Sequence, residues 1–333
     1  MTFLGRTARA MAATAIISVL PMLPAHAQQT FDATLASVNS PDFLTVQAMQ
    51  MFIDLAREKT EGGVNFNLAA NGQMGSQKET YEQVMGGIIE AAHVSGSVFG
   101  ASLPELQLLQ LPFLYRDNAH MVRVVSGEIG QGLYDKLEEA TGVKVLMLAL
   151  ADGPRSVWNN ARPIRTPADM NGLTIRVPEN PIMLDTFQAL GALPTPMPFG
   201  EVYMAAKQGV IDGGESPPYA LGEFRAWEVG KYFSLDMHTS GHAVLAINAD
   251  WYNSLPENYQ AALEEASAES VAWFNVELEK ANEQAMTDAA SHGMEINEVD
   301  DLDAFREAVA PVYAKYAPIV GGEAAIQAVI DTP

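Results

Sequence analysis

Apolar residues follow two different periods along the N-terminal part of the chain, and together these periods predict an α/β fold. Over 43–59 they recur every three to four positions, as in an amphipathic helix, whereas over 64–68 they alternate with polar residues, as in a strand. Further strands are predicted over 31–38 and 88–94, and a glycine-rich loop opens a helix that ends at Met85. This order of elements predicts parallel strands with helices packed on their faces.

A second unit of the same kind is predicted to follow the first. A helix over 120–140 leads to a wholly apolar run over 143–150, as expected for a strand buried on both faces. Strands and helices then alternate again, beginning with a short polar strand over 156–160. Residues 209–214 are predicted to end in a tight turn and 241–248 to form another strand. We therefore expect an α/β fold of two lobes with a ligand cleft between them.

The lobe boundaries are predicted from the points where the chain crosses between these units. Lobe I is predicted over 28–152 and about 241–275, and lobe II over 153–240 and about 276–333. Residues 256–292 contain no internal Gly or Pro, and they predict one helix of about 55 Å. Because a small lobe is only about 30 Å across, such a helix would span both lobes.

The start of the chain has the pattern of a secretory signal peptide over 1–27. Arg6 and Arg9 precede an apolar run over 11–23, and Ala25-His26-Ala27 is the small-x-small pattern that a signal peptidase recognises. The apolar run is shorter than the roughly 20 residues that a bilayer span needs, so an uncleaved membrane anchor is the less favoured alternative. We expect a periplasmic product without membrane insertion.

The charge and composition of the chain exclude several classes of protein. It has 19 Lys and Arg against 41 Asp and Glu residues, a net charge of −22 at pH 7, so nucleic acids and anionic membranes repel it. It has no Cys, which excludes disulfides and cysteine nucleophiles. The motifs of serine hydrolases, phosphate loops, zinc proteases and calcium loops are also missing from the sequence. Gly241 interrupts the pair His238 and His242, which would suit zinc only on a helix. We therefore expect no catalytic residue, metal or cofactor.

Two arginines carry the candidate binding chemistry. Arg155 follows the predicted lobe crossing, and Arg176 lies inside a predicted strand, where a guanidinium needs a partner. Its planar fork matches a carboxylate, either of a ligand or of one of the many acidic side chains, and the pattern leaves both open. His93 and Ser95 end a predicted parallel strand, where α/β sheets place ligands. The other local candidates are Ser97, Asn180, Trp158 and Tyr219. The two aromatic residues are equally suited to the core of a lobe.

Several stretches of the sequence together carry a family pattern. In chain order they cover 71–76, 111–114, 153–156, 162–178, 190–203 and 208–215. They include Gly153-Pro154-Arg155-Ser156 and Thr174-Ile175-Arg176-Val177-Pro178. In content and order these stretches closely resemble the TRAP-transporter solute-binding proteins of the C4-dicarboxylate-binding type.

This resemblance implies a two-lobed periplasmic binding protein, class II-like, with a hinged cleft and a long helix spanning both lobes. It implies a receptor that closes on a small-molecule carboxylate and delivers it to the small and large membrane subunits of a TRAP permease. A monomer is expected, with a helix-swapped dimer as the alternative. By the same resemblance, Arg176 forms the principal salt bridge with the ligand and Arg155 a second positive contact. Phe199 packs against the ligand, and Glu215 borders the pocket.

The class of ligand is where the chain departs from the family pattern. Many relatives have a ligand-contacting asparagine where this chain has Ser216, and a hydroxyl donates one hydrogen bond where an amide donates two. Residues 153–156 and 169–172 resemble members that bind sugar acids, so a uronate or aldonate is predicted. C4-dicarboxylates, 2-oxo acids and aromatic acids are alternatives, and a cation assisting at Glu215 stays open. So do a ligand sensor for a membrane kinase and a secreted sugar-acid hydrolase or lyase using Glu215 and Asp185.

Overall fold

The computed structural model describes residues 29–333, except for the side chains of Ala149 and Ala151. The signal peptide predicted over 1–27 lies outside the described residues. Over 29–333, no helix combines the length and the apolar character that a membrane span needs.

The N-terminal part folds as its apolar pattern predicts. Its elements are β1 (Phe31–Ser37), α1 (Leu44–Lys59), β2 (Val64–Ala69), α2 (Gln77–Met85) and β3 (Ala91–Ser95). β1 lies between β2 and β3 and pairs with both in parallel, which confirms the predicted arrangement. The carboxyl ends of these strands therefore meet at one edge of the sheet, where α2 begins.

Two long antiparallel strands, β4 (Val143–Asn159) and β8 (Tyr232–Asn248), run through the whole molecule. Residues 243–247 of β8 pair with β3, whereas residues 232–235 pair with β9 (Glu295–Glu298). The separate strands predicted over 143–150 and 156–160 are thus parts of one strand. Register shifts near Leu150, Gly153 and Val157 let this strand bend and remain paired over its length.

The remaining strands extend the sheet from the far half of β4. They are β7 (Gly213–Ser216), β5 (Thr174–Val177) and β6 (Leu193–Pro196), and the full order is β2-β1-β3-β8-β4-β7-β5-β6. The prediction of a tight turn ending at Gly214 is wrong, because β7 already begins at Gly213. A Cβ on Gly213 would overlap the carbonyl oxygen of Trp158, so the absence of a side chain lets β7 approach β4.

Replacing Gly213 with Ala is therefore expected to destabilise the protein by about 1–3 kcal/mol, because backbone atoms of β4 cannot move aside. The matched control is Gly132→Ala within α4 (Glu128–Thr141), where a Cβ meets nothing within 4 Å. That change is expected to stabilise the helix by about 0.5–1 kcal/mol. Chemical denaturation measures both. Equal unfolding free energies for the two variants would contradict the close approach of β7 and β4.

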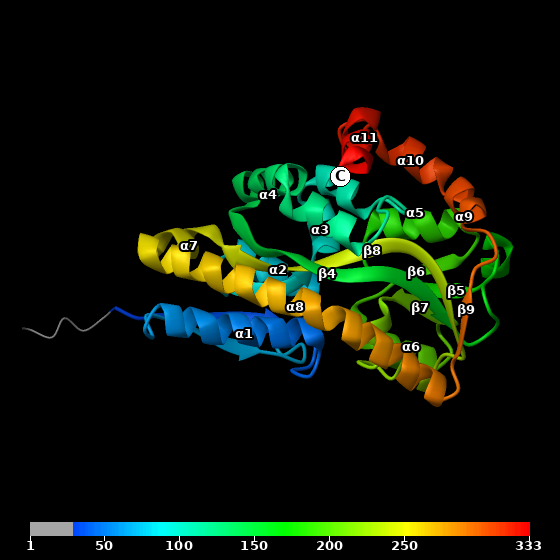
Figure 1. Ribbon diagram of the computed structural model, residues 1–333, viewed down its shortest axis with the longest axis horizontal. Helices are drawn as coiled ribbons and strands as arrows, with labels where there is room; N and C mark the ends of the chain where they lie inside the picture. Colours follow the sequence, from blue (N-terminus) through cyan, green and yellow to red (C-terminus); the bar gives the residue numbers. More distant parts are fainter. Residues whose placement is uncertain (1–28) are drawn as a thin grey trace, which may run out of the picture.

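Helices cover the sheet on both faces (Figure 1). The single helix predicted over 120–140 is divided into α3 (Asn118–Ser126) and α4 by Gly127, whose backbone is extended. The short helices α5 (Pro181–Ala189) and α6 (Val202–Lys207) accompany the second group of strands. The C-terminal helices lie over α5 and α3: they are α9 (Leu302–Ala308), α10 (Ala310–Tyr316) and α11 (Glu323–Asp331).

The long helix predicted over 256–292 is present as α8 (Glu257–Ser291), which follows the short α7 (Ala249–Ser254). Its first part packs with α1, where Leu263 and Phe274 enter a shared hydrophobic cluster. Near its end, Ala289 enters a second cluster with β8 and the segment around Trp158. One helix thus braces both groups of strands, as expected, whereas the residue boundaries of the two lobes stay a prediction.

Candidate functional site

A cleft of about 950 Å³ opens where the two groups of strands meet along β4 and β8. One wall comes from the start of α2 and the end of β3, and the other from the segments that follow β5, β6 and β7. Most of the predicted ligand-binding residues line it: His93, Ser95, Arg155, Arg176, Phe199, Ser216 and Tyr219, together with Ser97. The cleft therefore gathers side chains that are far apart in sequence.

Glu215 holds the guanidinium of Arg155. Arg155 Nη2 donates to Glu215 Oε1 at 2.8 Å while Nε donates to Oε2, so both carboxylate oxygens are used. The Glu215 side chain is fully buried, and Glu215 is not among the described residues that line the cleft. Burial alone would raise the pKa of Glu215, but Arg155 and His238 lower it below its usual 4.5. Glu215 thus lies behind the arginines as seen from the cleft, and its contact with a ligand stays a prediction.

Arg176 reaches the cleft from the middle of β5. Its Nε and Nη2 donate to the carbonyl oxygen of Met197 at 2.9 and 2.7 Å, which fixes the plane of the guanidinium. Among the described residues, Nη1 makes only a loose ion pair, 3.9 Å from Glu215 Oε1. Burial lowers the pKa of Arg176 to about 10, so the side chain stays charged at neutral pH. The partner that a mid-strand guanidinium requires is therefore a backbone carbonyl, and one edge is left for an anion.

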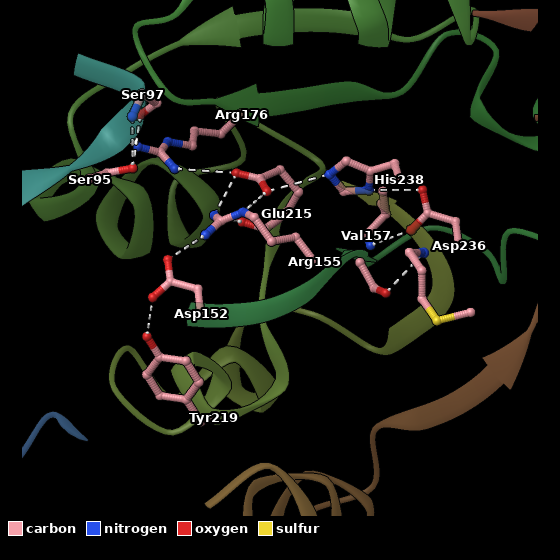
Figure 2. Close-up of polar contacts among 12 residues, drawn as sticks. Ser95, Ser97, Asp152, Arg155, Val157, Arg176, Glu215, Tyr219, Asp236 and His238 are labelled. Atoms are coloured by element: carbon pink, nitrogen blue, oxygen red, sulfur yellow. Dashed lines mark hydrogen bonds and ion pairs between the residues drawn. The ribbon is translucent and has the colours of Figure 1, made fainter. Parts of the chain in front are cut away.

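The two arginines belong to a continuous chain of polar contacts (Figure 2). On one side, Asp152 Oδ2 lies 3.5 Å from Arg155 Nη1, and Tyr219 donates its hydroxyl proton to Asp152 Oδ1 at 2.7 Å. On the other side, His238 Nε2 lies 3.5 Å from Glu215 Oε2. Each charged group faces opposite charge, so the arginines are held in place before any ligand arrives.

The sequence alone did not lead us to the contact between His238 and Asp236, which continues this series of polar contacts. His238 Nδ1 lies 3.0 Å from Asp236 Oδ2, and Asp236 Oδ1 accepts a hydrogen bond from the amide of Val157. Residues two apart on a strand point to the same face. The acidic residue two positions before this histidine could therefore have indicated that the two side chains are paired. Burial opposes the charge on His238, but Asp236 and Glu215 raise its pKa to about 9.

A pH dependence of stability follows from the raised pKa of His238. The charged His238 contributes fully to the free energy of unfolding below its unfolded pKa of 6.5. This contribution is lost as the pH rises through about 9. The shift corresponds to about 3 kcal/mol. We expect the difference in unfolding free energy between wild type and His238→Gln to shrink between pH 6.5 and 9, measured by urea denaturation. Burial lowers the pKa values of His93 and His242 to about 4. Both residues therefore reduce the stability of the folded state as the pH falls below 6.5. A pH-independent difference would contradict a charged His238.

Two residues that were predicted to bind the ligand, Asn180 and Trp158, do not line the cleft. Asn180 uses its amide nitrogen for the carbonyl oxygen of Ser97 and its amide oxygen to cap α5 at Ile182, and it is not among the described cleft residues. Trp158 is 1% exposed and packs on Phe224 and beneath Gly214. Neither is among the described residues that line the cleft, and a ligand contact of either stays a prediction.

The remaining cleft residues show what the site offers a ligand. Phe199 is half-buried and presents an aromatic wall beside Phe224, and Ser95 and Ser97 hydrogen bond to each other. Thr239, which sequence analysis did not select, also lines the cleft and pairs in register with Arg155. His242 hydrogen bonds to Tyr134, apart from the partners of His238. Across residues 29–333, no group of three or more His, Asp or Glu side chains suits a metal ion.

Comparisons with known proteins agree on one family. The model of the bacterial extracellular solute-binding proteins, family 7, matches residues 35–318. A solute-binding protein of Chromohalobacter salexigens is 32% identical over 84% of this chain and 83% of its own. The 2,3-diketo-L-gulonate-binding periplasmic protein YiaO of Escherichia coli is 33% identical over 79% of each chain. A TRAP periplasmic solute-binding protein of Roseobacter denitrificans, solved with bound β-D-glucuronate, has a TM-score of 0.86 at 29% identity, covering 91% of this chain and all of its own.

Proposed function

The chain belongs to the bacterial extracellular solute-binding proteins of family 7, and from this premise we propose that it is the periplasmic receptor of a TRAP transporter for a sugar acid. The observation that carries the proposal is the free edge of Arg176 in the cleft, next to an Arg155 already neutralised by Glu215. This edge suits one carboxylate, and each charge-assisted hydrogen bond contributes about 1.5–3 kcal/mol.

Binding is proposed to close the cleft. A ligand that contacts both walls stabilises the closed state by its greater affinity for that state. In our proposal Arg176 anchors the carboxylate, Arg155 adds charge from the side, and Phe199 covers an apolar face of the ligand. Glu215 is assigned to positioning Arg155. The proposed partners are the small and large membrane subunits of a TRAP permease, which receive the ligand from a monomeric receptor.

A sugar acid is proposed as the ligand because relatives at similar identity are named for acids of this class. The Escherichia coli relative is named for 2,3-diketo-L-gulonate, and the Roseobacter denitrificans structure holds β-D-glucuronate. The polar side chains along the cleft fit such hydroxylated acids better than they fit an aromatic acid. We propose that the ligand is bound and released unchanged, which NMR spectra of the ligand before and after incubation test.

The deciding experiment is a thermal-shift screen of residues 28–333, refolded to remove any ligand carried through purification. The compounds are uronates, aldonates, C4-dicarboxylates, 2-oxo acids and aromatic acids, with and without calcium. A compound at about 1,000 times its Kd should stabilise the folded state by about 4 kcal/mol. We expect stabilisation by sugar acids, and a clearly smaller stabilisation of Arg176→Ala by the same compounds. Stabilisation only by neutral or cationic compounds would refute the proposal.

A further inference from the structure

Two segments from opposite walls of the cleft are in direct contact. One is the loop over 38–43, which follows β1 at the same edge of the sheet as the end of β3. The other is the segment over 217–223, which follows β7. Each contributes an aromatic ring that lines the cleft, and the rings of Phe43 and Tyr219 pack with their centroids 5.1 Å apart. The two walls are therefore joined at this point.

A carboxylate strengthens this contact. Glu223 accepts two hydrogen bonds from Ser40, whose backbone amide donates to Oε1 at 3.0 Å and whose hydroxyl donates to Oε2 at 3.2 Å. Burial raises the pKa of Glu223 above 4.5, whereas the hydrogen bonds from Ser40 favour its ionised form. Hydrogen bonds to an ionised group are stronger than those between neutral groups. Both oxygens of Glu223 thus depend on one residue of the opposite wall.

The two partners are fixed to different hydrophobic clusters. Phe43, three residues after Ser40, is buried in the cluster that holds α1. Leu221 and Phe224, which lie on either side of Glu223 in sequence, pack in the cluster of the second group of strands. A movement of one group of strands away from the other would therefore pull Ser40 away from Glu223.

We propose that Ser40 and Glu223 form a clasp between the two walls, and that this clasp must break before the cleft opens. Among the described residues that line the cleft, neither of the two is found, so the clasp acts on opening and not on the ligand directly. Bonds that exist only in the closed arrangement shift the equilibrium toward it by their own free energy. The inference rests on the proposed closure of the cleft, and not on the identity of the ligand.

The test is double electron–electron resonance on the ligand-free protein with one spin label on each wall. Since the chain has no Cys, Glu82→Cys on α2 and Gln208→Cys at the end of α6 provide two unique and exposed sites for the labels. We expect Glu223→Ala to raise the ratio of molecules with the longer label distance to those with the shorter one by about tenfold. Ser40→Ala removes one of the two hydrogen bonds and should raise this ratio by less.

The matched control is Glu228→Ala, which removes an exposed carboxylate that accepts a hydrogen bond from Tyr203 on α6. It should leave the distance distribution unchanged. Circular dichroism reports whether each variant is folded, and Ser40→Ala decides the test if Glu223→Ala unfolds. If the folded clasp variants give the distribution of the labelled wild type, or if Glu228→Ala shifts it equally, the inference is wrong. The receptor proposal would survive that result, because the thermal-shift screen tests it separately.

Discussion

Arg176→Ala is expected to weaken carboxylate binding by up to about 100-fold, because the variant loses a charge-assisted contact of up to about 3 kcal/mol. Its guanidinium is buried, fixed by two hydrogen bonds to Met197 and directed at the cleft. Without it, a ligand carboxylate would lie near Glu215 with only Arg155 to compensate two negative charges. Titration calorimetry with the best acid from the screen measures the loss.

Two further variants distinguish the anchoring of the ligand by Arg176 from a general effect of positive charge on affinity. Arg176→Lys keeps the charge but not the planar fork, so we expect an intermediate affinity. Arg306→Ala removes the same charge from an exposed ion pair with Asp303 on α9 and should leave affinity unchanged. An Arg176→Ala variant that binds within threefold of wild type would overturn the assignment of Arg176 as the anchor.

The largest stability effect is expected at Glu215. Glu215→Ala removes the carboxylate shared by Arg155, Arg176 and His238, and breaking a buried pair in this way typically costs about 3–5 kcal/mol. The wild-type contribution is present above the unfolded pKa of 4.5 and is lost as the pH falls below it, since the folded pKa is lowered. Urea denaturation at pH 7 and pH 4 measures both effects.

The control for this prediction is Glu265→Ala, which removes an exposed ion pair between α8 and Lys59. Such a pair contributes at most about 1 kcal/mol. Glu215→Gln retains the shape and one acceptor oxygen, and its loss of stability should lie between the two alanine variants. A loss below 1 kcal/mol for Glu215→Ala would mean that the buried ion pairs are not what stabilises this part of the sheet.

Much of the fold could be predicted from local pattern alone. The alternation of strand and helix through β3 and the uninterrupted run of α8 depend on neighbouring residues, whose periodicity is visible in the sequence. The continuity of β4 and the strand β7 depend on pairing with β8 and β4, which are distant in sequence. A run such as Asp212-Gly213-Gly214 has the local chemistry of a turn and becomes a strand only because β4 lies beside it.

The candidate site could likewise be predicted only in part. Arg176 was found because a charged residue inside an apolar strand is conspicuous, Arg155 because it follows the predicted lobe crossing, and Phe199 through the family resemblance. The partners of these residues were not predictable, because charge in a sequence does not reveal whether a carboxylate faces the cleft or an arginine behind it. Glu215, Asp236 and Thr239 acquire their roles only from strand pairing across the centre of the sheet.

The pairing of Arg155 with Glu215 bears on how the cleft treats inorganic anions. Chloride, phosphate and sulfate are attracted to any cluster of exposed positive charge, and an unpaired pair of arginines would retain them. Here one guanidinium is neutralised from within and the other presents a single edge. A simple anion thus finds one free guanidinium edge rather than two. The internal carboxylate thereby leaves an inorganic anion less uncompensated positive charge to bind in the cleft.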